Sequence, residues 1–82
     1  MKTTIEISKY PLKENYEPPI LNFIERLNAH DGIEVKTNAT ATHLVGDYDE
    51  IMGLLQKEIK HSFELYGKAI FVVKILHGAL DI

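Results

Sequence analysis

The sequence predicts a protein of the α+β class whose elements follow the order β-α-β-β-α-β. Segments that alternate apolar and polar residues, as half-buried strands do, flank and separate two segments with helical spacing of apolar residues. The length of 82 residues suits one domain, and an apolar content of 45% is typical of a folded chain. We therefore expect a single domain over residues 1–82.

The first predicted element is a strand over residues 3–10. In this segment Ile5 and Ile7 point to one face, while Glu6 and Ser8 point to the other. One face would therefore pack against the helices, and the other face would stay polar.

A helix follows, and it begins at Pro18 and Pro19, because proline fits the first helical turn, where amide donors lack partners anyway. It ends at Asp31-Gly32, where the glycine can adopt the left-handed conformation past the helix end. The predicted apolar stripe of this helix consists of Ile20, Leu21, Phe23, Ile24 and Leu27.

The middle of the chain predicts a hairpin. Alternation over residues 33–38 indicates a second strand, a tight connection covers residues 38–41, and a third strand follows over residues 42–46.

The second half predicts a long helix and a last strand. Asp47-Tyr48-Asp49-Glu50 is a variant of the capping box, which marks a helix start, and Gly67 ends the helix. Residues 69–76 form a nearly continuous apolar strand. The apolar residues with helical spacing are Ile51, Leu54, Leu55, Ile59, Phe63 and Tyr66.

This order of elements favours a ferredoxin-like split sheet. Right-handed crossovers would give four antiparallel strands in the order 4-1-3-2, with both helices on one face. The last strand would then lie at a sheet edge although it is apolar on both faces, and such an edge invites pairing. We therefore expect the protein to form a homo-oligomer, either a dimer or a tetramer.

Composition excludes several classes of partner. The formal net charge of −3 argues against nucleic acid, which needs a basic face. No segment has the length of a membrane span, and the N-terminus lacks the apolar core of a signal peptide. We therefore expect a cytoplasmic protein that binds neither nucleic acid nor a membrane.

Catalytic and metal chemistry also find little support in the sequence. The chain contains no cysteine, no nucleophile motif, no phosphate-binding loop and no cofactor fingerprint. Glu58 and His61 have the spacing of carboxylate-bridged metal sites, but such sites need that motif twice, so we expect a solvated helix face there. We predict neither catalysis, nor a cofactor, nor a metal. An enzyme that uses His43 as a general base remains an alternative.

The polar run over residues 37–43 is the most unusual feature of the chain, because it occupies a predicted strand pair. Glu6 and Ser8 would lie nearby on the open sheet face. Carboxylate, hydroxyl and amide groups together suit a small heteroaromatic ligand. Alternation leaves open whether Thr42 or His43 faces outward, and these groups could instead pair across a subunit interface or stay solvated.

The chain resembles the YkoF-like thiamine-binding, or hydroxymethylpyrimidine-binding, family in two motifs. The first is Tyr10-Pro11-Leu12 after the first strand. The second is Asn38-Ala39-Thr40-Ala41-Thr42, followed by Leu44-Val45-Gly46-Asp47-Tyr48-Asp49-Glu50-Ile51-Met52. The resemblance implies a ferredoxin-like fold, oligomers that form through the sheets, and binding of thiamine or its pyrimidine moiety without catalysis.

The resemblance makes Thr42 the site hydroxyl, with Asn38 and Thr40 in the same segment. Two departures matter: the chain stops where many relatives have a further helix, and Thr40 replaces a methionine that is common in the family. The first departure puts the tetramer in doubt, and the second allows a different ligand. The predicted ligand-binding residues are Glu6, Ser8, Asn38, Thr40, Thr42 and His43.

Overall fold

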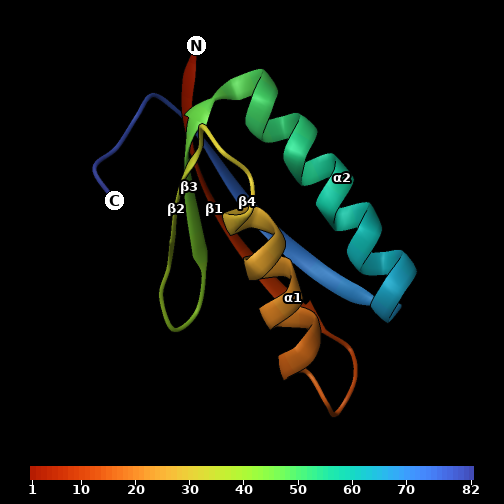
Figure 1. Ribbon diagram of the computed structural model, residues 1–82. Helices are drawn as coiled ribbons and strands as arrows, with labels where there is room; N and C mark the ends of the chain where they lie inside the picture. Colours follow the sequence, from red (N-terminus) through yellow and green to blue (C-terminus); the bar gives the residue numbers. More distant parts are fainter.

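The computed structural model describes residues 1–82 and has the predicted order of elements. The elements are β1 (Lys2–Pro11), α1 (Glu17–Asn28), β2 (Glu34–Thr37), β3 (Thr42–Asp47), α2 (Tyr48–Tyr66) and β4 (Ala69–His77). The four strands form one antiparallel sheet in the order β2-β3-β1-β4. Figure 1 shows both helices on the same side of this sheet. The predicted ferredoxin-like topology is therefore confirmed.

The helix ends follow local rules that the sequence carries. Prolines occupy the first turn of α1, where they remove no helical hydrogen bond. The carboxylate of Asp47 caps α2 by accepting a hydrogen bond from the amide of Glu50. Gly67 ends α2 with a φ of 85°, a conformation that side chains disfavour.

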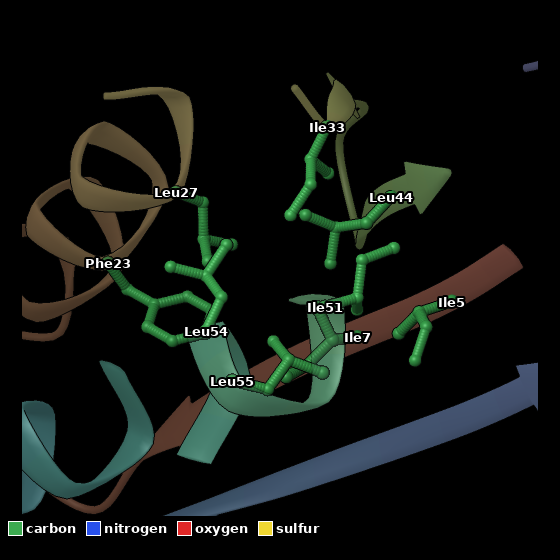
Figure 2. Close-up of a cluster of buried hydrophobic side chains, with 9 residues drawn as sticks. All are labelled: Ile5, Ile7, Phe23, Leu27, Ile33, Leu44, Ile51, Leu54 and Leu55. Carbon is green, nitrogen blue, oxygen red and sulfur yellow. The ribbon is translucent and has the colours of Figure 1, made fainter. Parts of the chain in front are cut away.

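The hydrophobic core lies between the sheet and the two helices (Figure 2). β1 contributes Ile5 and Ile7, and β3 contributes Leu44, all nearly inaccessible to solvent. Leu21 was expected in the stripe of α1 but is 60% exposed, because it lies on the side of the helix turned away from the sheet. The complete core consists of Ile5, Ile7, Phe23, Leu27, Ile33, Leu44, Ile51, Leu54 and Leu55.

Arg26 and Glu58 join the two helices. Nε of Arg26 donates to Oε2 of Glu58 at 2.8 Å, and one terminal nitrogen donates to Oε1 at 2.9 Å. The side chain of Glu58 is only 4% exposed. The expectation of a solvated helix face at Glu58 is therefore wrong, because α1 supplies a bidentate partner for its carboxylate.

The other face of the sheet carries no helix. The segment after β4 turns back across one end of this face, where the hydroxyl of Thr4 donates to the carbonyl of Gly78 and accepts from the amide of Leu80. Neither helix combines the length and the apolar composition that crossing a membrane requires.

Candidate functional site

The strand register decides which way the polar run faces. Thr42 lies opposite Ile7, and His43 lies opposite Glu6. Because Ile7 belongs to the core, Thr42 points toward the helices and is 4% exposed. His43 therefore points to the open face. The six predicted residues do not form one site but divide between the two faces of the sheet.

On the open face, the carboxylate of Glu6 contacts two side chains, His43 and Lys74. Nε2 of His43 lies 3.2 Å from Oε2 of Glu6, and Nζ of Lys74 lies 3.6 Å from Oε1. Both contacts join residues directly opposite each other on neighbouring strands. Such cross-strand pairs stabilise sheets, so this group is satisfied within the chain.

A hollow of about 350 Å³ also opens on this face, between the hairpin and the C-terminal segment. His43, Lys36 and Asn38 line one side, and the last residues of the chain line the other. These last residues are Leu80, Asp81 and Ile82, and Thr4 and Thr37 complete the lining.

Asn38 shapes the connection between β2 and β3 (Figure 1). Its Oδ1 accepts hydrogen bonds from the amides of Thr40 and Ala41, both at 3.0 Å. The backbone amide of Asn38 donates a hydrogen bond to the carbonyl of Ala41 at 2.9 Å. Asparagine side chains commonly hold turns in this way. Asn38 therefore fixes the positions of Thr40 and Ala41.

Ser8 ties this connection to β1. The pairing of β1 with β3 ends at Ile7 and Thr42, so Ser8 lies just beyond it. Its hydroxyl donates to the carbonyl of Thr40 at 3.1 Å. This hydrogen bond holds the tip of the hairpin beside β1.

A cavity of about 90 Å³ lies between the hairpin, β1 and α1, and we call it the hairpin cavity. One wall is polar, and there the hydroxyls of Thr37 and Thr42 lie 3.0 Å apart. The opposite wall is apolar and includes Phe23. Four of the six predicted residues line the cavity: Ser8, Asn38, Thr40 and Thr42. The rest of the lining consists of Ile7, Lys9, Ile20, Ile24, Ala39 and Ala41.

Lys9 is a lining residue that sequence reasoning missed. Strand alternation places Lys9 on the same face as Ile5 and Ile7, which pack in the core. A charged residue at a core-facing position is unusual, and this pattern could have marked Lys9 as a candidate site residue. Its Nζ donates to the carbonyl of Pro19 at 2.8 Å and lies 5.7 Å from the centre of the Phe23 ring. Burial lowers the pKa of Lys9 below its ordinary value.

Comparisons with known proteins identify the fold. No family model matches the chain, and no curated protein matches its sequence significantly. A structure from Thermotoga maritima, named as a candidate thiamine biosynthesis/salvage protein, has a TM-score of 0.88 and 19% identity, over 100% of this chain and 91% of that chain.

Two further structures are similar. A protein from Streptococcus pneumoniae has a TM-score of 0.87 and 23% identity, over 98% of this chain and 90% of its own. A hypothetical protein from Methanocaldococcus jannaschii has a TM-score of 0.81 and 25% identity, over 99% of this chain and 84% of its own. These likenesses support the fold.

Proposed function

We propose that the protein binds thiamine or a related pyrimidine without catalysing a reaction, with the pyrimidine ring in the hairpin cavity. The two unlike walls of the cavity carry this proposal. A heteroaromatic ring needs hydrogen-bonding groups at its edge and apolar contacts on its faces. Hydroxyls of Thr37 and Thr42 on one side and the ring of Phe23 on the other match both needs.

The size of the cavity limits how much of the ligand it takes. A cavity of about 150 Å³ accommodates benzene, so a cavity of about 90 Å³ has to enlarge by about two thirds to admit one ring. β2 can allow this, because it is an edge strand of four residues whose side chains are mostly exposed. The rest of the ligand would lie outside the cavity.

Two further observations support a thiamine-related ligand. The motif that resembles the YkoF-like family, Asn38 to Thr42, is the segment that forms the polar wall. A structural neighbour is also named as a candidate thiamine biosynthesis/salvage protein. Glu6 and His43, which we predicted as ligand residues, pair with each other on the opposite face and take no part in this proposal.

Titration calorimetry with thiamine and with hydroxymethylpyrimidine tests the proposal. Thr42→Val keeps the shape of the side chain but removes its hydroxyl, so we expect affinity to fall about tenfold, as the loss of one hydrogen bond implies. His43→Gln lies outside the cavity and serves as the control, with unchanged affinity.

Two results would count against this function. The absence of both heat and a rise in melting temperature at millimolar ligand would exclude binding. If His43→Gln lost affinity and Thr42→Val did not, the ligand would bind in the open-face hollow, which His43 lines, and not in the hairpin cavity.

A second candidate is an assembly module that binds no small molecule. The apolar side chains of β4 favour it, because Ile70, Val72 and Leu76 are between 43% and 52% exposed. They lie on the open face, opposite Tyr10, Ser8 and Thr4 of β1. Lys74, which pairs with Glu6, lies between Val72 and Leu76 on this face. Exposed apolar side chains gathered on one strand are typical of an interface between protein chains. Self-association is compatible with ligand binding, so the two candidates need separate measurements.

A further inference from the structure

The side chain of Lys9 reaches from β1 to the first turn of α1. Its Nζ donates to the carbonyl of Pro19 at 2.8 Å, and this is the only hydrogen bond between β1 and α1. Pro19 is one of the buried residues of α1. The contact therefore ties the start of this helix to the sheet.

Three aromatic rings lie beside the same ammonium group. Nζ of Lys9 is 5.7 Å from the ring centres of Phe23 and Phe71 and 5.4 Å from that of Tyr66. These rings belong to α1, β4 and α2, so cation–π attraction adds to the hydrogen bond from three elements. No ion pair of the chain includes Lys9. A carbonyl and aromatic rings, and not a carboxylate, therefore hold this ammonium in place.

The helix that Lys9 holds supplies the apolar wall of the hairpin cavity. The α1 residues of the lining are Ile20, Phe23 and Ile24, and Lys9 lines the cavity beside them. Of the four groups that contact the ammonium, only the ring of Phe23 belongs to a lining residue. Lys9 therefore acts on the cavity through the position of α1 and not as a charge that meets the ligand.

The opposite wall of the cavity is held by fewer contacts. The pairing of β1 with β3 ends at Ile7 and Thr42. Beyond that point, the hydroxyl of Ser8 gives the tip of the hairpin one hydrogen bond to β1, at the carbonyl of Thr40. The enlargement that one ring requires would therefore occur on the hairpin side, while α1 stays in place.

We propose that Lys9 is a positioning residue that fixes the apolar wall of the hairpin cavity and so limits the size of the ring substituent that the cavity admits. This inference rests on the proposed function and specifies its ligand class. In thiamine and in hydroxymethylpyrimidine, a methyl group lies across the ring from the carbon that leads to the rest of the molecule. It points inward when the rest lies outside. A larger alkyl group there would have to displace α1 against the contacts of Lys9.

Titration calorimetry of the whole chain with hydroxymethylpyrimidine and with its propyl homologue, in which propyl replaces the ring methyl, tests the inference. The wild type should prefer the methyl compound at least about tenfold, because overfilling a confined space is costly. Lys9→Met keeps an unbranched side chain but loses the donor and the charge, so it should lose most of this preference. Lys9→Arg keeps a cationic donor that also stacks on aromatic rings, and it should retain the preference.

Lys13→Met is the matched control. Nζ of Lys13 lies 5.8 Å from the centre of the Tyr66 ring, but Lys13 does not line the hairpin cavity. This variant removes the same charge from the chain and should leave the preference unchanged.

An unchanged preference in Lys9→Met would overturn the inference, even with a lower melting temperature, because Lys9 would then only stabilise the fold. If Lys9→Met does not fold, Tyr66→Leu takes its place, since it removes one ring from the ammonium at the last residue of α2. An unchanged preference in that variant has the same meaning. Equal affinity of the wild type for both compounds would overturn the inference and leave the proposed function standing. Binding of neither compound would remove both together.

Discussion

Asp47 links the end of the sheet to the start of a helix. It is the last residue of β3, and its carboxylate accepts a hydrogen bond from the amide of Glu50 at 3.2 Å. This hydrogen bond is the main cause that lowers the pKa of Asp47 below its ordinary value of 3.8. The ionised form is therefore the one that holds the first turn of α2.

Acidification should weaken this cap. The folded protein holds the pKa of Asp47 below 3.8, the ordinary value that applies in the unfolded chain. The ionised cap therefore stabilises the fold fully above pH 3.8, and this stabilisation is lost as the pH falls through the lower pKa of the folded protein. Asp47→Asn keeps a neutral cap and removes the titration. We expect urea unfolding at pH 7 and at pH 2.5 to show a smaller acid-induced loss in the variant than in the wild type. Equal losses in both proteins would contradict the assignment.

Strand phase shows where sequence reasoning stops at the level of single residues. One face of β3 carries Thr42 and Leu44, and the other carries His43 and Val45, so each face has one polar and one apolar side chain. Alternation alone cannot choose between two such faces. The register against Ile7 of β1 chooses, and register is a long-range property. For this reason the sequence grouped six residues that the register divides: Ser8, Asn38, Thr40 and Thr42 line the hairpin cavity, and Glu6 and His43 pair on the open face.

At the level of elements, helices and strands follow from local patterns, but contacts between them do not. The periodicity of apolar residues and the residues at helix ends predicted every helix and strand to within a few residues. The pairing of Arg26 with Glu58 joins residues 32 positions apart. A single sequence gives no signal for such a pair, so Glu58 was assigned to solvent although it is buried.

Arg26→Met should destabilise the protein, because it leaves the buried carboxylate of Glu58 without its partner. Since Arg26 itself is about a third exposed, we expect a moderate effect, with a fall in melting temperature of about 5 °C or more. The double variant Arg26→Met/Glu58→Met removes both charges and should recover much of the loss. Scanning calorimetry measures both. A double variant less stable than Arg26→Met would show that the pair is not the source of the effect.

At the level of the whole molecule, the fold leaves one face of its sheet without a helix. Figure 1 shows both helices on the opposite side. β4 lies at the edge of the sheet and has exposed apolar side chains on both of its faces, including Val72 on the open face and Ile75 on the other. Burial of such residues stabilises a protein by roughly 25 cal/mol per Å² of apolar surface, and small chains often gain this burial by association.

We therefore expect the protein to self-associate through β4 and the open face. Val72→Lys replaces an exposed apolar side chain with an ammonium that faces Ser8 and, unlike that of Lys74, has no carboxylate opposite it. It should shift the protein to monomers, because desolvating an unpaired ammonium opposes association. Leu65→Lys is the matched control, since Leu65 is 56% exposed but lies on α2, away from the open face. Size-exclusion chromatography with light scattering, repeated over a range of protein concentrations, distinguishes the outcomes. A wild type that stays monomeric at all concentrations would disprove the expectation, and dissociation by Leu65→Lys but not Val72→Lys would place the interface on the helices.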